Sequence, residues 1–250
     1  MCRPGRAGVL ADEAQSQDAG APRKRNLRFS KPGPRWLILL FHSTIIATVL
    51  AADSPLFEDN FTGKLGAGWT WIRPNAEAWR IRDNALEVRI EPGNMWGPAN
   101  DARNLLVRPA PDLADGPIEI SVTVSNRPSS QYEQVDLVWY YDEGNMVKLG
   151  HELVDGKLSI VMGLEKMDRT RTIAIIPVTA HSVQLRHRVE KNRLRGEFLL
   201  EGSDAWTTAG ECELPATGEP ARISLQFYQG PAQLERWARV SNFRIVRPTK

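Results

Sequence analysis

Two neighbouring segments of the sequence carry polar side chains at a spacing of two residues, which places them on one face of a β-strand. Gln134, Asp136 and Tyr140 share one face of the first segment, and Lys148 and Glu152 share one face of the second. A hairpin would bring these two faces together. Amides, carboxylates and an ammonium group bind sugar hydroxyls, and an aromatic ring covers the apolar face of a sugar. The pattern therefore indicates a site for a hydroxyl-rich ligand.

Other segments add candidates to this site. Gln226 and Tyr228 share the polar face of a later strand, and Trp96 lies in a turn-rich loop that is followed by Arg103. An exposed Trp96 would stack on a ligand, although a tryptophan packed over the end of the protein is equally expected. The structural alternative for the whole set is an ordinary group of cross-strand charges on a solvated sheet face.

The sequence contains no catalytic signature. Retaining glycosidases need two carboxylates that face each other across a groove. Glu133 and Asp136 are three residues apart, so on one strand they point to opposite faces, and no third glutamate follows at the required spacing. His181 and His187 lie about 20 Å apart on an extended strand, too far to share a metal. We therefore predict neither a catalytic residue nor a metal site from these motifs.

Strand signals dominate residues 53–250, and helical spacing is hard to find. Alternating or β-branched and aromatic residues occupy the segments 118–124, 135–141, 146–153, 157–162, 183–189, 193–199, 222–228 and 240–246. Turn residues recur roughly every 8–12 residues, which gives about 13 to 15 short strands. The spacing predicts one all-β domain, a sandwich or a barrel.

Residues 1–52 do not read as folded protein. A basic segment of 35 residues precedes a 17-residue apolar run, Trp36–Ala52, that ends in small residues. This is the pattern of a secretory signal peptide. The alternative is an uncleaved membrane anchor, although the run is at the short limit of a membrane span. We predict a domain of residues 53–250 that is secreted or periplasmic, or membrane-anchored if the apolar run is retained.

The positive charge of the chain is concentrated in the predicted leader. Residues 1–52 hold eight of the 32 Lys and Arg and three of the 30 Asp and Glu, so residues 53–250 carry −3 against +2 for the whole chain. A nearly neutral domain of mixed charge does not predict nucleic-acid binding. Cys2 lies in the leader, and Cys212 is predicted to be a small core residue without a disulfide partner.

Several local patterns occur in a fixed order along the domain: Leu56–Phe61, Gly68–Trp71, Trp79–Val88, Asn104–Pro109, Tyr132–Glu152, Phe198–Trp206 and Arg239–Ile245. Together they resemble the concanavalin A-like domain at the C-terminus of family 43 β-xylosidases and the related DUF1349 group. The resemblance implies a jelly-roll sandwich of two antiparallel sheets. Those enzymes carry their catalytic machinery in a separate propeller domain, so the resemblance implies a sugar-related context and not xylosidase activity.

Many proteins of this fold hold a structural calcium, for which Asp59 and Asn242 are the candidate ligands in this chain; no other cofactor is expected. The function predicted is a secreted, non-catalytic module that binds an oligo- or polysaccharide. Two alternatives stay open. One is a small glycan-active hydrolase with Asp136 and Glu152 as its carboxylates, and the other is a structural or interaction protein of the cell surface.

Overall fold

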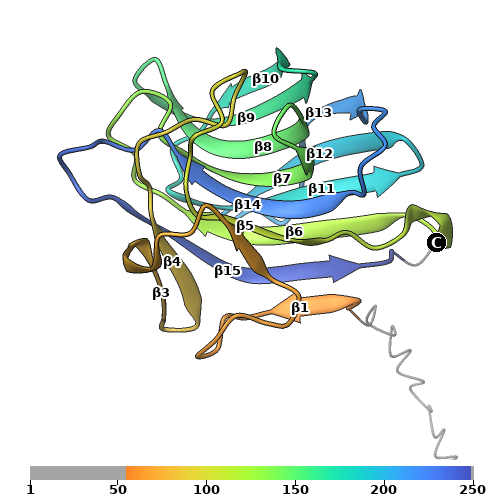
Figure 1. Ribbon diagram of the computed structural model, residues 1–250, viewed down its shortest axis with the longest axis horizontal. Helices are drawn as coiled ribbons and strands as arrows, with labels where there is room; N and C mark the ends of the chain where they lie inside the picture. Colours follow the sequence, from red (N-terminus) through yellow and green to blue (C-terminus); the bar gives the residue numbers. More distant parts are fainter. Residues whose placement is uncertain (1–54, 249–250) are drawn as a thin grey trace, which may run out of the picture. The chain divides into compact units, whose positions relative to one another are not determined.

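The computed structural model describes residues 55–248, and the predicted signal segment, residues 1–52, lies outside the described residues. The described chain forms two antiparallel β-sheets that pack face to face (Figure 1). Its fifteen strands lie at the upper end of the predicted number. The predicted fold class, an all-β sandwich of two antiparallel sheets, is confirmed.

The eight-stranded sheet has the order β13-β12-β11-β6-β15-β4-β3, and β1 pairs with β15 beside this path. Its strands are β1 (Phe57–Asp59), β3 (Trp79–Arg82), β4 (Ala85–Arg89), β6 (Ile118–Ser125), β11 (Ser182–Glu190), β12 (Arg193–Leu200), β13 (Thr207–Glu213) and β15 (Trp237–Val246).

The seven-stranded sheet has the order β10-β9-β8-β7-β14-β5-β2. Its strands are β2 (Thr70–Ile72), β5 (Leu105–Pro109), β7 (Gln134–Asp142), β8 (Asn145–Val154), β9 (Lys157–Lys166), β10 (Arg169–Pro177) and β14 (Arg222–Tyr228). Two short 3-10 helices, η1 (Ala76–Ala78) and η2 (Leu113–Asp115), are the other regular elements between residues 55 and 248. Within this range no helix has the length and apolarity to cross a membrane.

Consecutive segments that the sequence predicts as strands pair as hairpins in the structure. The β7–β8 hairpin turns at Asp142–Asn145, and the β11–β12 hairpin turns after Glu190. Strand β10 was not predicted, because it lies at the edge of its sheet with a largely exposed first half, Arg169–Thr172. A strand without a buried face gives no alternating hydrophobic pattern.

The main core lies between the two sheets. Trp139 and Phe227 from the seven-stranded sheet pack in one cluster with Leu185 and Phe198 from the eight-stranded sheet. Cys212 belongs to the same cluster and is only 6% exposed, so its prediction as a core residue is confirmed. Burial raises the pKa of its thiol to about 11, which keeps the thiol protonated and unreactive at neutral pH.

Five tryptophans, Trp69, Trp71, Trp79, Trp139 and Trp237, lie in strand patterns that predict core positions, and the structure divides them into two groups. Trp69 and Trp139 are buried. Trp71 and Trp79 pack together at the margin of the core with ring centroids 5.2 Å apart, and both are half-buried. Trp237 is also half-buried, and the Arg80 guanidinium lies 4.1 Å from the centroid of its ring. The core prediction is therefore wrong for Trp237.

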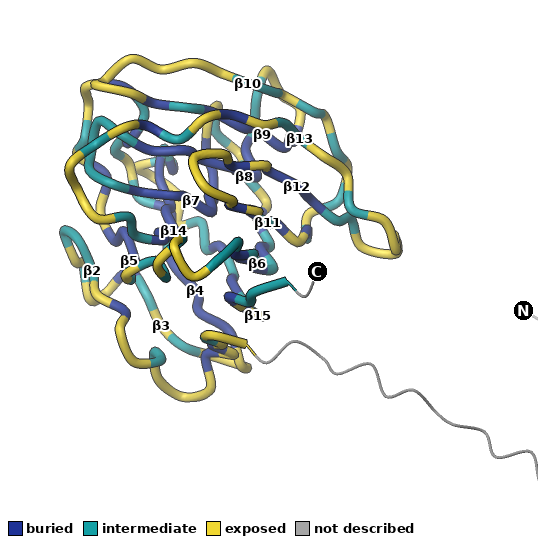
Figure 2. Tube along the Cα trace, turned by 90° about the vertical axis from the view of Figure 1, so that its right-hand side faces the viewer, coloured by how far each residue is buried: buried dark blue, intermediate teal, exposed yellow. Residues whose placement is uncertain are grey.

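The central strands of the seven-stranded sheet, β7, β8 and β14, are buried on both faces over most of their length. Val138, Tyr140, Met146 and Tyr228 alternate with the core residues of their strands, so they lie on the outer face, yet they are at most 1% exposed. Figure 2 shows β7, β8 and β14 as dark blue over most of their length. The outer face of these strands does not contact the core between the sheets, so other residues must cover it. The loop between β4 and β5 provides this cover.

Candidate functional site

Strand register brings the predicted polar residues into adjacent rows on the outer face of the seven-stranded sheet. Gln134 of β7 lies opposite Glu152 of β8 on one side and Tyr228 of β14 on the other. In the next row Asp136 lies opposite Gln226. The prediction that these residues share one face is therefore confirmed by the register.

Glycines at two positions of the face leave room for larger groups. Gly150 lies opposite Asp136, and a Cβ atom there would be 1.8 Å from Asp136 Oδ1, so the carboxylate lies flat over the Gly150 backbone. Gly163 lies opposite Lys148, and a Cβ atom there would be 2.4 Å from Cη2 of Trp96. The indole ring of Trp96 therefore rests directly on the sheet.

The β4–β5 loop (residues 90–104) carries Trp96 over this face. In Figure 1 the loop rises from β4 toward β9 and β10 and returns to β5. Asn94 shapes its first turn, since Asn94 Oδ1 accepts hydrogen bonds from the backbone N–H groups of Met95 (2.9 Å) and Trp96 (3.0 Å). Met95 and Ala102 of the loop pack against Val138 and other residues of the outer face. The loop is therefore a packed cover.

The cover changes the character of the predicted site. Asp136 is 0% exposed, Lys148 3% and Glu152 5%, and Gln134, Gln226 and Tyr228 are no more exposed than 1%. The expectation of an open groove is wrong, and so is the alternative of a solvated charged sheet face. The predicted residues converge, but they do so in a buried polar cluster beneath the β4–β5 loop.

Lys148 is the cation of this cluster. Its Nζ donates hydrogen bonds to Gln134 Oε1 at 2.5 Å and to Glu152 Oε2 at 3.1 Å. The same atom lies 4.9 Å from the centroid of the Trp96 ring and 5.8 Å from that of Tyr228. Two polar partners and two aromatic faces thus stabilise an ammonium group that has lost its water.

The neighbouring polar groups lack such partners. Neither carboxylate oxygen of Asp136, neither amide atom of Gln226, nor the hydroxyls of Ser224 and Tyr228 has a hydrogen-bond partner within residues 55–248. The Tyr228 hydroxyl lies beside the Asp136 carboxyl, and a weak side-chain hydrogen bond between them opposes the rise in the pKa of Asp136 caused by burial, although the pair falls outside strict hydrogen-bonding geometry. Buried polar atoms in folded proteins are almost always paired with protein groups or ordered water, so these atoms have unused hydrogen-bonding capacity.

Burial dominates the electrostatics of Asp136. Loss of solvent raises the pKa of its carboxyl to about 7; Lys148 opposes this shift and the negative charge of Glu152 adds to it. The group therefore changes between a donor and an acceptor near neutral pH.

Glu165 of β9 belongs to the site and was not predicted. It is fully buried, and its two carboxylate oxygens each accept a hydrogen bond of 3.1 Å from the backbone N–H of Gly97 in the β4–β5 loop. Burial raises the pKa of Glu165 to about 7 against the effect of that bond. Glu165 is two residues from Gly163 and therefore lies on the same face of β9. The alternation of side chains along the strand could have predicted this position from the sequence.

Two predicted residues lie outside the polar cluster. Arg103 is exposed, and its Nη2 donates to the carbonyl of Pro74 at 3.4 Å, so the prediction that it reaches the site is wrong. It points away because the backbone of Ala102 and Asn104 is tied to Arg73 on the edge of the sheet. Tyr140 is on the correct face but packs in the apolar cluster under the loop.

The calcium hypothesis finds no support at Asp59. Its carboxylate already accepts hydrogen bonds from the N–H groups of Phe61 (2.8 Å), Gly66 (2.8 Å) and Trp69 Nε1 (3.0 Å). Asn242 instead donates to Thr123 Oγ1 at 3.4 Å. The described part of the chain contains no group of three or more His, Cys, Asp or Glu that could hold a metal ion. Asp59 therefore closes the Asp59–Trp69 loop by hydrogen bonds.

Gly163→Ala tests whether Trp96 rests on the sheet. The added Cβ would meet the indole at 2.4 Å, so we expect a loss of about 1–3 kcal/mol in the free energy of unfolding, measured by urea denaturation. In a Trp96→Ala background the same change should cost almost nothing. Gly218→Ala is the control, because no atom lies within 4 Å of its added Cβ. Equal costs in both backgrounds would contradict the packing of Trp96 on Gly163.

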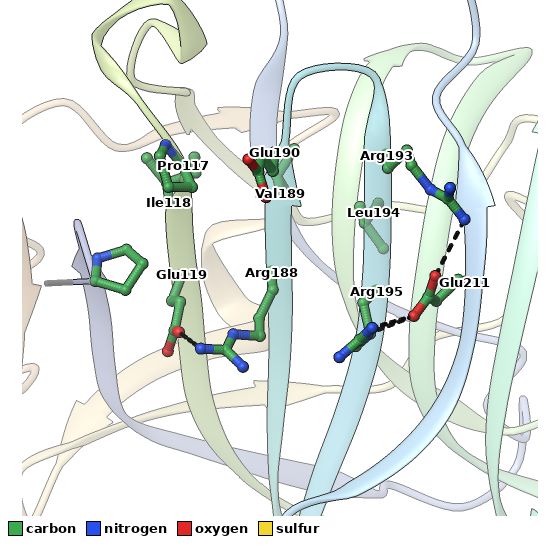
Figure 3. Close-up of a pocket in the computed structure, with 11 residues that line it drawn as sticks. Pro117, Ile118, Glu119, Arg188, Val189, Glu190, Arg193, Leu194, Arg195 and Glu211 are labelled. Atoms are coloured by element: carbon green, nitrogen blue, oxygen red, sulfur yellow. Dashed lines mark hydrogen bonds and ion pairs between the residues drawn. The ribbon is translucent and has the colours of Figure 1, made fainter. Parts of the chain in front are cut away.

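A separate hollow of about 430 Å³ lies on the eight-stranded sheet (Figure 3). Its arginines are already paired: Arg188 with Glu119, and Arg193 and Arg195 with Glu211. Surface ion pairs of this kind neutralise one another, and Glu190 is the one charge of this lining without an ion pair among the described residues. The buried cluster under the β4–β5 loop is therefore the stronger candidate site.

Comparisons with known proteins agree with the two-sheet sandwich described above. Residues 58–230 match the family model described as the beta xylosidase C-terminal concanavalin A-like domain. No curated protein sequence matches the chain. Among solved structures, the GH43 protein BlXynB from Bacillus licheniformis aligns at a TM-score of 0.68 with 19% identity, and a xylan β-1,4-xylosidase from Bacillus halodurans aligns at 0.66 with 18% identity.

Each of these two alignments covers 76% of this chain but only 39% of the bacterial enzyme. A protein of unknown function from Saccharomyces cerevisiae aligns at a TM-score of 0.57 with 15% identity, over 73% of this chain and 98% of the yeast chain. The sandwich therefore occurs both as one part of larger GH43 proteins and as nearly all of a solved chain.

Proposed function

The chain belongs to the β-xylosidase C-terminal concanavalin A-like domain family, and from that premise we propose that it binds carbohydrate without catalysing hydrolysis. The single observation that carries the proposal is the set of buried, unpartnered polar groups on β7 and β14, namely Asp136, Ser224, Gln226 and Tyr228. A sugar offers hydroxyls that both donate and accept hydrogen bonds, which is what this mixed set requires.

Aromatic groups at the same site strengthen the proposal. The Trp96 ring and the Tyr228 ring both lie near Lys148 Nζ, so apolar faces stand beside the polar groups. Carbohydrate sites combine a few placed polar groups with aromatic surfaces in this way. Xylan is the first ligand to test, because one solved structure with this fold is a xylan β-1,4-xylosidase.

Export from the cytoplasm is part of the proposal. The basic segment and the apolar run Trp36–Ala52 support a signal peptide, which would place the domain outside the cell or in the periplasm. N-terminal sequencing of the protein recovered from culture medium, periplasm and membranes separates a cleaved signal from a retained anchor. A first residue near Asp53 supports cleavage, and an intact apolar run in the membrane fraction contradicts it.

Tyr228→Phe is the substitution that tests the binding proposal most directly. It removes only a hydroxyl whose one neighbour within residues 55–248 is a weakly bonded Asp136 carboxyl, so the fold should be retained. Binding should weaken about 10- to 100-fold, because a sugar hydroxyl loses its partner in a buried site. Affinity gel electrophoresis and calorimetry with xylan, mannan, mixed-linkage β-glucan and starch measure the effect.

Tyr141→Phe is the matched control. Tyr141 is next to Tyr140 in the chain, and its side chain packs against the core between the sheets, away from the proposed site. It should bind the same glycans as the unmodified protein. Equal binding by the Tyr228→Phe variant would place the carbohydrate elsewhere, and no binding to any glycan in the panel by the unmodified protein would overturn the proposed function.

Hydrolysis is the second candidate function, and one observation favours it. Asp136, whose pKa is raised to about 7, shares the buried cluster with Glu152, which is paired to Lys148. A carboxyl with a pKa near neutral pH beside a second carboxyl group is the starting point for general acid and base chemistry. Incubation with the same glycan panel and analysis of the released sugars decides the question. Reducing ends that accumulate with the unmodified protein but not with Asp136→Asn would establish an enzyme.

A further inference from the structure

We propose that the site holds the end of a glycan, one or two sugar rings, and excludes the middle of a chain. This inference rests on the proposed carbohydrate binding and adds the mode of recognition. It follows from how the β4–β5 loop is attached and from the shape of the group of unpartnered atoms beneath it.

The β4–β5 loop is attached to the sheet on both sides of the polar cluster. At its start, the backbone N–H groups of Gln229 and Gly230, just after β14, donate to the carbonyls of Gly93 and Glu91, each at 3.0 Å. At its tip, the Gly97 N–H donates to Glu165 of β9. The loop therefore crosses the sheet from β14 to β9.

The tip reaches the last strand of the sheet. A Cβ atom at Gly97 would lie 3.9 Å from Thr170 Cγ2 of β10, and the Trp96 ring fills the space above Gly163. A polysaccharide lying across β14, β7, β8 and β9 would have to pass through the loop backbone. Open sheet faces that bind the middle of a chain have no such barrier.

The group of unpartnered atoms is small. Asp136 and Gln226 are neighbours in one row, and Tyr228 and Ser224 lie one row to either side on β14. Adjacent strands are about 5 Å apart and alternate residues of one strand about 7 Å apart. The group therefore matches one or two sugar rings in size. All four residues are 0% exposed, so the group has no open path along which a glycan could run on in both directions.

Chain-end recognition predicts that binding follows the number of ends and not the mass of glycan. Xylan, mannan, mixed-linkage β-glucan and starch are each compared before and after partial acid hydrolysis, at equal mass. Hydrolysis that shortens the mean chain about tenfold should raise binding about tenfold, because the concentration of ends rises by that factor. Calorimetric titration of the soluble fractions measures the ratio for the glycan that binds.

The second part of the experiment uses a variant that lacks both contacts of the loop tip with β9, namely Trp96 on Gly163 and Gly97 with Glu165. Trp96→Gly combined with Glu165→Leu, which leaves the Gly97 N–H without an acceptor, releases the loop from β9, and the ratio of hydrolysed to intact binding should fall toward one. Intact glycan bound as well as or better than its hydrolysate by the unmodified protein would overturn chain-end recognition and leave the proposed function standing. Binding of neither form of any of the four glycans would overturn both.

Discussion

Asp136→Asn is expected to stabilise the protein at pH 8 while weakening carbohydrate binding. Burial raises the pKa of Asp136 from its ordinary 3.8 to about 7. A carboxyl with a raised folded-state pKa contributes stability that is fully present below pH 3.8 and is lost as the pH rises through 7. Asparagine has the shape of the protonated acid and does not titrate, so the variant does not undergo this loss.

The expected change in the free energy of unfolding is large for a substitution that replaces one carboxyl oxygen by an amide nitrogen. Relative to the unmodified protein at each pH, the free energy of unfolding of the variant should rise by about 4 kcal/mol between pH 4 and pH 8. Other titrating groups, including the buried Glu165, are present in both proteins and cancel in this difference to first order. Urea denaturation at several pH values measures the difference directly.

Asp204→Asn is the control for this experiment, because Asp204 is exposed between β12 and β13. Its effect on stability should be small and nearly independent of pH. A stability difference for Asp136→Asn that stays constant from pH 4 to pH 8 would contradict a buried carboxyl with a raised pKa. Stabilisation together with lost binding is the behaviour of a residue kept for function at the expense of folding.

Lys148→Met is expected to give the largest loss of stability among the site variants, about 3–5 kcal/mol. Lys148 is 3% exposed and is the hydrogen-bond donor to both Glu152 and Gln134. Methionine has a similar length but leaves the Glu152 carboxylate buried without its cation. Chemical denaturation followed by tryptophan fluorescence measures the loss.

The double variant Lys148→Met with Glu152→Met separates this mechanism from lost packing. With both charges removed, most of the stability should return, because a buried ion pair can be replaced by apolar residues of similar volume at little cost. If the double variant is as unstable as Lys148→Met alone, the role of Lys148 is packing against Trp96 and Tyr228 and not charge pairing.

Much of the site could be predicted from period-two arithmetic alone. Gln134, Asp136, Lys148 and Glu152 were assigned to one face because backbone geometry alternates side chains strictly along a strand. The hairpin turn at Asp142–Asn145 then fixes which residues of β7 and β8 stand opposite each other. Asp136 and Gln226 meet because β14 pairs with β7, which no local pattern indicates.

The errors have a common physical origin. Trp96, Arg103 and Glu165 are placed by the β4–β5 loop, and the course of a loop depends on contacts far along the chain, such as that between Gly97 and Glu165. Sequence patterns describe elements with a period, and this loop has none. The same reason explains why a solvated or open face was expected where the structure has a buried one.

The sequence by itself determined the all-β class, the hairpins and the polar face of β7 and β8, because each depends on neighbours within a few residues or on the alternation of a strand. Only the tertiary structure decided that this face is covered, that Lys148 is paired while Asp136 is not, and that Trp96 lies on Gly163. These features depend on desolvation, which requires atoms from distant segments to exclude water from the same place.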